Sequence, residues 1–134
     1  AYVIKADVKE ENNFFEALAN IGYEVNAKDL QVFYGGVKKG DWDVGLAMDM
    51  IRLAPKLDTV VLVSGDGDFQ PLVKYLKSSG CRVEVIAFAK TASSKLIDEA
   101  DSFFDIDKNR RRFLIPDKKR QPLSVVIDPN VQAK

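Results

Sequence analysis

The chain has 134 residues, with 20 lysine and arginine residues against 20 aspartate and glutamate residues, so its formal net charge is zero. This length fits one domain with a single core, and the neutral balance means that any nucleic-acid surface has to be local. Histidine is absent, which excludes His-ligated zinc and nucleophilic sites of the Ser-His-Asp and Cys-His types. The single cysteine, Cys81, excludes a disulfide framework, and we expect it to be a buried apolar residue. Since the sequence has no membrane-length apolar run and no leader, we expect a cytoplasmic protein.

Strand and helix patterns alternate along the first 106 residues. The expected elements are a strand over 1–5, a helix over 10–21 ended by Gly22, an extended segment over 23–33, a glycine-rich basic loop over 34–40, a helix over 41–54 ended by Pro55, a strand over 59–63, a helix over 70–79 ended by Gly80, a strand over 82–88, a helix over 93–100 and a strand over 102–106. The apolar face of the first helix comprises Phe14, Phe15, Leu18 and Ile21, and that of the second comprises Val44, Ala47, Met48 and Ile51. The alternation predicts a three-layer α/β fold with a mostly parallel sheet.

The most informative segment is Ser64-Gly-Asp-Gly-Asp68, which we call the acidic turn. It follows four apolar residues, 60–63, whose continuous run predicts a strand buried on both faces. Ligands of open α/β sheets bind at the carboxyl ends of the strands, so Asp66 and Asp68 are placed to hold a divalent cation. This pattern favours chemistry at phosphate.

A second group of acids lies at the start of the second helix. For Asp41, a helix cap or a first-turn acid favoured by the helix dipole is as good an explanation as a role in the site. We expect Asp43 to lean over the sheet edge toward the acidic turn. Asp49 falls six residues later and is rotated well away, so that a solvated or salt-bridged helix acid is the favoured interpretation.

In this order, KKGDWDVGLAMDM (38–50), VVLVSGDGDF (60–69), GCRVEVIAF (80–88) and SSKLIDEADSFFDI (93–106) resemble the NYN domain family, in its LabA-like branch, within the PIN-like nuclease superfamily. The resemblance covers residues 1–106 and implies a Rossmann-like, PIN-like fold whose acidic cluster binds Mg²⁺ or Mn²⁺ and hydrolyses single-stranded or structured RNA. It assigns catalytic metal ligands to Asp43, Asp66 and Asp68, and polar residues of the same pocket to Ser64, Ser93 and Ser94.

On this interpretation the acids and metal polarise the scissile phosphate and activate a water, so no histidine is needed. Lys38 and Lys39 could contact the phosphodiester backbone, and the basic residues at 110–112 and 118–120 could extend that track, although a solvated surface is the simpler explanation for each. Trp42 could stack on a base, but packing against the sheet edge is favoured.

One departure from the family pattern concerns its first strand, which is central in the sheet and ends in Asp-x-x-Asn. Residues 1–5 align better with the family's second strand, so we expect the domain over 1–106 to lack the first strand and helix. Residues 107–134 are expected to form a basic tail with an extra strand over 123–127, followed by Asp128 and Asn130. That strand could fill the gap within one chain or between the chains of a homodimer, while an edge strand or a loose terminus is the plainer interpretation.

Two other functions stay open at this point. A non-catalytic LabA-like regulatory or RNA- or protein-binding module would keep the acidic pocket, and the neutral charge and missing first acid favour it. A phosphatase of the haloacid dehalogenase type would use Asp66 as the phosphoryl-accepting nucleophile, but no convincing lysine motif follows downstream.

Overall fold

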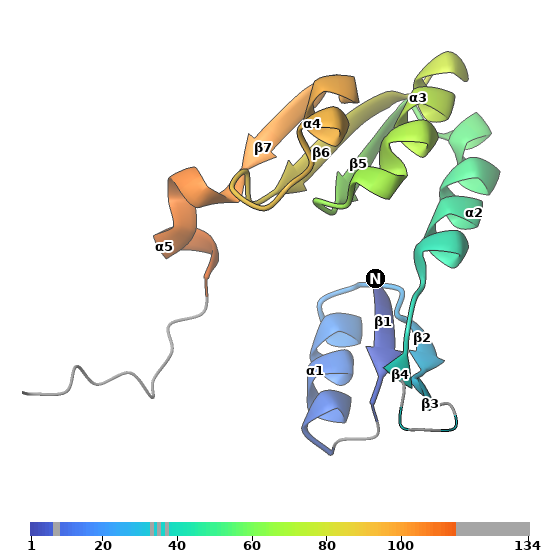
Figure 1. Cartoon of the computed structure of the whole chain (residues 1–134), viewed down its shortest axis with the longest axis vertical. Helices are drawn as coiled ribbons and strands as arrows, with labels where there is room; N and C mark the ends of the chain where they lie inside the picture. The colour runs from blue at the N-terminus through green and yellow to red at the C-terminus, as the bar shows by residue number, and fades with distance from the viewer. Residues whose placement is uncertain (7–8, 33, 35, 37, 115–134) are drawn as a thin grey trace, which may run out of the picture.

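The structure is a computed structural model that describes residues 1–6, 9–32, 34, 36 and 38–114 (Figure 1). Its strands and helices alternate, which confirms the predicted α/β class. The elements in chain order are β1 (Tyr2–Lys5), α1 (Lys9–Asn20), β2 (Asn26–Asp29), β3 (Gln31–Val32), β4 (Lys38–Lys39), α2 (Asp43–Leu53), β5 (Thr59–Val63), α3 (Gln70–Ser78), β6 (Arg82–Ala87), α4 (Ser94–Glu99), β7 (Ser102–Asp105) and α5 (Arg110–Phe113), with 3-10 turns η1 (Ala54–Lys56), η2 (Gly67–Phe69) and η3 (Ile106–Asn109). No described helix is both long and apolar enough to cross a membrane.

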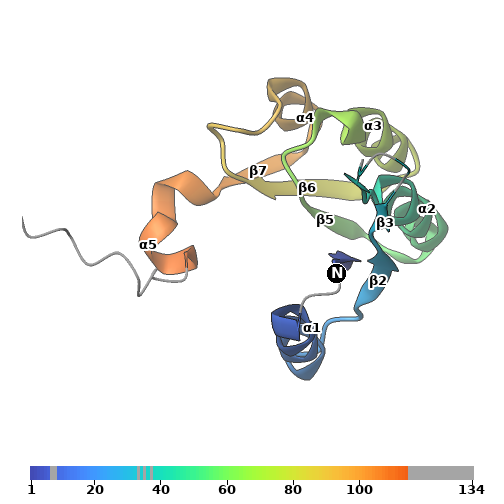
Figure 2. The ribbon, with the colours of Figure 1, turned by 60° about the horizontal axis from the view of Figure 1, so that its bottom comes forward.

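The described strands form three separate sheets. Strands β1 and β2 pair in parallel, β3 and β4 pair antiparallel, and β5, β6 and β7 form a parallel sheet in chain order (Figure 2). The mostly parallel arrangement was predicted, but the extended segment over 23–33 is divided into β2 and β3, and the basic loop contains β4. Because β5 to β7 are parallel, the segments that follow these strands all emerge at one edge of the sheet.

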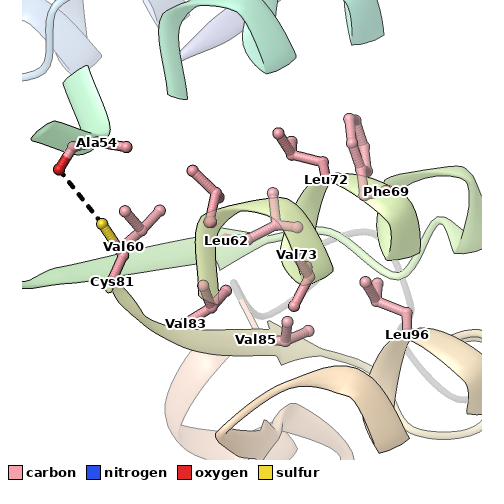
Figure 3. Packing of buried hydrophobic residues seen from close by; sticks show 11 residues of the cluster. Ala54, Val60, Leu62, Phe69, Leu72, Val73, Cys81, Val83, Val85 and Leu96 are labelled. Atoms are coloured by element: carbon pink, nitrogen blue, oxygen red, sulfur yellow. Dashed lines mark hydrogen bonds between the residues drawn. The ribbon is translucent and has the colours of Figure 1, made fainter. Parts of the chain in front are cut away.

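The core lies where α3 and α4 pack on one face of the three-stranded sheet (Figure 3). Its fully buried side chains are Val73, Leu76, Val83, Val85 and Leu96. Each contributes about 1.5–3 kcal/mol through removal of its apolar surface from water. Cys81 is also buried, as predicted, and its thiol lies 3.3 Å from the carbonyl oxygen of Ala54.

Strand β5 alternates between buried and exposed side chains. Val60 and Leu62 are buried in the core, whereas Val61 is 51% exposed and Val63 is 68% exposed. The prediction of a strand buried on both faces is therefore wrong. The physical reason is that the core elements cover a single face of β5, and within the described residues β5 pairs with β6 on one edge only.

Helix α2 turns a different face to the core than its sequence pattern predicts. Leu46, Ala47 and Met50 pack against the core, while three members of the predicted stripe are exposed, namely Val44, Met48 and Ile51. Apolar residues occur around most of this helix, so its periodicity alone did not select the buried face.

Helix α1 is less buried than predicted. Phe15 and Leu18 are half-buried, but Phe14 and Ile21 are exposed. The helix ends as expected at Gly22, whose φ is +99°, and the Tyr23 N–H donates to the Leu18 carbonyl oxygen at 3.1 Å. This is the hydrogen bond of a glycine-terminated helix, in which the left-handed residue reverses the chain.

The start of α2 joins the β1–β2 pair to the rest of the fold. The indole N–H of Trp42 donates to the Val3 carbonyl oxygen at 3.1 Å, and its ring meets that of Tyr2 edge-on at a centroid distance of 5.8 Å. The favoured packing of Trp42 against the sheet edge is thus confirmed. A Cβ atom on Gly45 would lie 2.2 Å from the Trp42 ring, so glycine is required where the ring crosses the helix.

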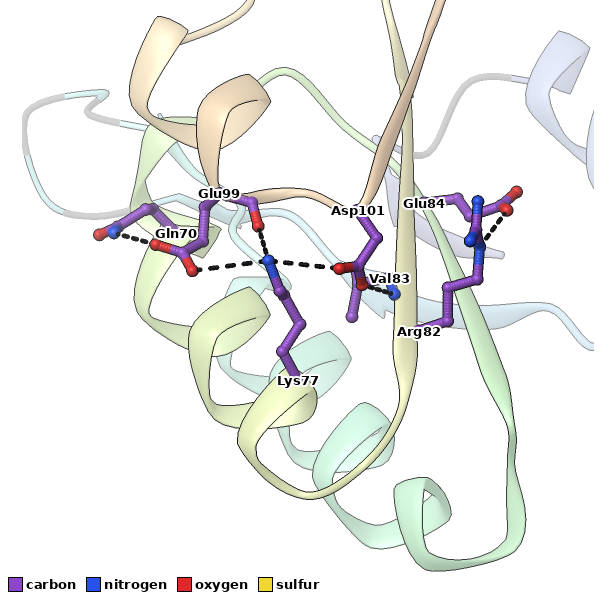
Figure 4. Close-up of polar contacts among 7 residues, drawn as sticks. All are labelled: Gln70, Lys77, Arg82, Val83, Glu84, Glu99 and Asp101. Atoms are coloured by element: carbon purple, nitrogen blue, oxygen red, sulfur yellow. Dashed lines mark hydrogen bonds and ion pairs between the residues drawn. The ribbon is translucent and has the colours of Figure 1, made fainter.

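A polar network centred on Lys77 lies at the amino ends of β6 and β7 (Figure 4). The Lys77 ammonium donates to the Glu99 carbonyl oxygen at 2.6 Å and lies 3.4 Å from an Asp101 carboxylate oxygen. Asp101 also accepts the Val83 N–H at 2.8 Å, and that hydrogen bond holds the pKa of Asp101 below its usual value. These charges fasten α3 and the start of β7 to β6.

Candidate functional site

The acidic turn connects β5 to η2 and is held by its own side chains. The Ser64 hydroxyl oxygen accepts the Asp66 N–H at 3.2 Å, and one Asp66 carboxylate oxygen accepts the Asp68 N–H at 2.9 Å. Asp66 is therefore the cap of η2, which the buried ring of Phe69 fixes to the core. The side chains of Asp66 and Asp68 remain exposed at the carboxyl edge of the sheet.

Both glycines of the acidic turn are explained by the loop over 88–93, which packs against it. A Cβ atom on Gly65 would lie 3.1 Å from the Cα of Ala92, and one on Gly67 would lie 2.7 Å from the Ser93 hydroxyl oxygen. The Ser93 N–H donates to the Gly65 carbonyl oxygen at 2.9 Å. The loop thus places Ser93 beside the acidic turn, and the next residue, Ser94, is the exposed first residue of α4.

Asp43 is the first residue of α2, and its N–H donates to an Asp41 carboxylate oxygen at 3.0 Å. The pKa of Asp43 is raised, first by partial desolvation and then by the negative charges of Asp41, Asp66 and Asp68. The start of α2 and the acidic turn, separated in sequence, are therefore electrostatic neighbours in the fold.

A pocket of about 390 Å³ lies between these elements. Asp41, Asp43 and Ser64 supply its polar groups, and β1 contributes Tyr2 and Ile4. The sequence analysis did not place these β1 residues in the site, because nothing in a short apolar strand marks which neighbour it will face.

Asp49 belongs to a different contact group. Its carboxylate accepts the Tyr2 hydroxyl at 2.5 Å and pairs with Arg52 at 2.7 Å. The hydrogen bond from Tyr2 lowers the pKa of Asp49, while desolvation and then this bond raise the pKa of Tyr2 to about 12. These contacts are those of a helix acid that fastens β1 to α2.

Four of the predicted residues lie partly or wholly outside the described part of the chain. The backbone of Lys38 and Lys39 forms β4, but their side chains are not described. Asp128 and Asn130, with the expected strand over 123–127, lie outside the described residues.

Two acids at the carboxyl end of β7, Asp105 within the strand and Asp107 in η3, were missed by the sequence analysis. Asp105 accepts the N–H groups of Ala89 at 3.2 Å and Asp107 at 2.9 Å, and Asp107 accepts the Lys90 N–H at 3.2 Å. They hold the same loop that packs on the acidic turn. The available signal was an acid at the carboxyl end of a predicted strand, which Asp105 provides.

Asp41, Asp43 and Ser64 line the pocket, whereas Asp66 and Asp68 are not among its lining residues. The oxygen atoms of these side chains are nevertheless of the kind that a hard cation binds. Carboxylate and hydroxyl oxygens are the ligands preferred by Mg²⁺ and Mn²⁺. Among the described residues, however, no group of three or more acidic, cysteine or histidine side chains is close enough to hold a metal ion. Mg²⁺ is commonly held by one or two carboxylates and keeps several waters, so Asp43, Asp66 and Asp68 fit such a site without all three binding directly.

The chain matches a known protein family. The family model of the NYN domain matches residues 1–107. The low amplitude and bright protein LabA of Synechococcus elongatus is 25% identical over 122 residues, which are 87% of this chain and 65% of LabA. An uncharacterised protein of Methanocaldococcus jannaschii is 32% identical over 92 residues, which are 67% of this chain and 34% of that protein. The chain thus spans less than two thirds of the length of either relative.

A solved structure shares both fold and sequence with this chain. It is a protein of unknown function from Vibrio parahaemolyticus, with 40% identity and a TM-score of 0.74, and the match covers 81% of this chain and 68% of that one. The likeness supports a PIN-like α/β fold.

Proposed function

Because the chain belongs to the NYN domain family, we propose that it is a metal-dependent ribonuclease that hydrolyses RNA phosphodiester bonds at the acidic turn. Family membership and the likeness to LabA support an RNA-related function. The observation that carries the catalytic part is the electrostatic coupling of Asp43 to Asp66 and Asp68, at the edge where parallel sheets bind ligands.

In this proposal Asp43, Asp66 and Asp68 hold Mg²⁺ or Mn²⁺, which when bound neutralises phosphate charge and lowers the pKa of an attacking water. Desolvation and then the negative charges of Asp41, Asp66 and Asp68 raise the pKa of Asp43, and the same three charges favour a cation beside it. Ser64 accepts the Asp66 N–H, so its own hydroxyl hydrogen is left to donate to a phosphate oxygen.

The remaining residues of the proposed site contact the RNA backbone. Ser93 and Ser94 lie on the loop and helix next to the acidic turn, where their hydroxyls can donate to phosphate oxygens. We assign Lys38 and Lys39 the role of cationic contacts to the phosphodiester chain. We further propose that the domain acts in the cytoplasm, where an unpaired cysteine is usual. Nothing in the comparisons supports a homodimer, and the proposed site is built from one chain.

A second candidate function is a non-catalytic LabA-like module that binds RNA or protein through the same pocket. Two observations support this second function. No three-ligand group is present among the residues that the structure describes, and one Asp66 oxygen is already engaged by the Asp68 N–H.

Cleavage of labelled RNAs, both single-stranded and structured, separates these functions. The unmodified chain is compared with Asp66→Asn and Asp68→Asn in Mg²⁺, Mn²⁺ or chelator. Asp58→Asn is the matched control, because Asp58 is an exposed acid at the opposite end of the same strand. We expect metal-dependent cleavage that both site variants lose and the control keeps. RNA binding without cleavage in any metal would instead support the non-catalytic module, and cleavage that survives in both site variants would place the chemistry elsewhere.

A further inference from the structure

The segment that follows β7 concentrates positive charge in a chain whose formal net charge is zero. It comprises η3 and α5, and Lys108, Arg110, Arg111 and Arg112 are all exposed. Arg110 lies 3.6 Å from Asp107, whereas Arg111 and Arg112 have no ion pair among the described residues. Both guanidinium groups are exposed at the surface of the described part of the chain.

Exposed aromatic side chains accompany these arginines. The Phe113 ring is 46% exposed and meets the ring of Phe104, itself 43% exposed, edge-on at 5.5 Å. The Arg112 guanidinium lies 5.7 Å from the centroid of the Phe113 ring. We call Arg111, Arg112 and Phe113 the basic-aromatic surface. Its combination of guanidinium groups and an open ring suits phosphates next to unpaired bases, since bases stack on aromatic rings only when they are out of a duplex.

The basic-aromatic surface is connected to the acidic turn through a single loop. Asp105 and Asp107 hold the loop over 88–93 by its Ala89 and Lys90 N–H groups, and Ser93 at the other end of that loop donates to Gly65. All of these segments follow the carboxyl ends of β5, β6 and β7, so they share one edge of the sheet. Neighbouring strands are about 4.8 Å apart, which puts the ends of β5 and β7 roughly 10 Å from each other.

We propose that single-stranded RNA bound at the acidic turn continues along this edge and is held several nucleotides away by the basic-aromatic surface. The inference rests on the proposed function, because it takes RNA as the ligand of the acidic turn. Arg111 and Arg112 contact phosphates, and Phe113 stacks on a base. The surface therefore sets a preference for substrates that are unpaired and longer than the few nucleotides that the pocket itself receives.

Binding in chelator tests this surface separately from cleavage. Asp66→Asn protein is titrated with a labelled single strand of about 12 nucleotides, within the site sizes known for such surfaces, with a trinucleotide and with a duplex of the same length. The test variant is Arg111→Gln/Arg112→Gln. The control is Lys56→Gln/Lys74→Gln, which removes the same charge from exposed positions on η1 and α3.

We expect the arginine variant to bind the long single strand more weakly and to lower the slope of log affinity against log salt by about 1.4, the value for two phosphate contacts to a single strand. Phe113→Ala is expected to weaken binding roughly 5- to 150-fold, as for loss of one stacked base. The control variant and the trinucleotide should show no comparable change. Equal binding by the arginine variant and the control, or equal loss on the duplex, would overturn the proposal, and the absence of any RNA binding would do so in favour of an acidic protein partner. Loss of binding in a chain that never cleaves RNA would uphold the surface and refute only the nuclease.

Discussion

Because Trp42 contacts Gly45, we expect Gly45→Ala to change the free energy of unfolding in opposite directions when the Trp42 ring is present and when it is removed. A Cβ atom on Gly45 would lie 2.2 Å from Cε3 and 2.3 Å from Cζ3 of the Trp42 ring. In a helix without that ring, alanine stabilises by about 0.5–1 kcal/mol relative to glycine. Overpacking of this kind costs about 1–3 kcal/mol. We therefore expect Gly45→Ala to lower the free energy of unfolding by roughly 1–2 kcal/mol when Trp42 is present.

The same substitution made in a Trp42→Ala background meets no ring, so it should raise the free energy of unfolding by about 0.5–1 kcal/mol. Urea denaturation followed by far-UV circular dichroism measures all four chains of the cycle. Trp42 is the single tryptophan, so its fluorescence in Gly45→Ala also reports whether the ring is displaced. Destabilisation of equal size in both backgrounds would refute the packing of this ring across α2.

Three further predictions concern charge and packing. Asp43→Asn should leave the free energy of unfolding unchanged below the ordinary carboxyl pKa of about 4 and increase it at about pH 7. The pKa of Asp43 is raised by folding, so the charged carboxylate lowers stability as the pH rises from the pKa of the unfolded chain to that of the folded chain. Urea denaturation at both pH values measures this, and equal stability of the two chains at about pH 7 would contradict it. Asp49→Asn should lower the pKa of Tyr2 from about 12, since the charge and hydrogen bond that help to raise it are changed; spectroscopic titration against a Tyr2→Phe control checks this, and an unaltered curve would count against the contact. Leu76→Ala should cost about 2–5 kcal/mol because the side chain is fully buried, whereas Lys74→Ala, exposed on the same helix, should change stability by less than about 0.5 kcal/mol; similar losses in chemical denaturation would disprove the burial.

The sequence predicted the order and type of the main elements because their signals are local. Glycines at 22 and 80 end helices with φ values of +99° and +93°. It failed where burial depends on neighbours distant in sequence. Four apolar residues at 60–63 look the same whether one or both faces of β5 are covered, and the apolar residues around α2 do not reveal which of them meet the core.

The candidate site was predictable to a similar extent. The acids of the turn follow a strand, and the rule that ligands bind at this edge identified Asp66 and Asp68 before their contacts were known. The participation of Tyr2 in the pocket depends on how β1 meets α2 through Trp42, which is a tertiary contact without a local sequence signal. Gly65 and Gly67 accommodate the loop over 88–93, a contact between distant segments that has no local sequence signal.

The central claim is that Asp43 and Asp66 act in one catalytic site. Single-turnover cleavage of one labelled RNA in Mn²⁺, by Asp43→Asn, Asp66→Asn and the double variant, tests it most directly, with Asp58→Asn as the control. Residues that work as a unit give a double variant little slower than the slower single one. We predict that result. Losses that multiply as for two independent positions, or rates equal to that of the control, would contradict the account.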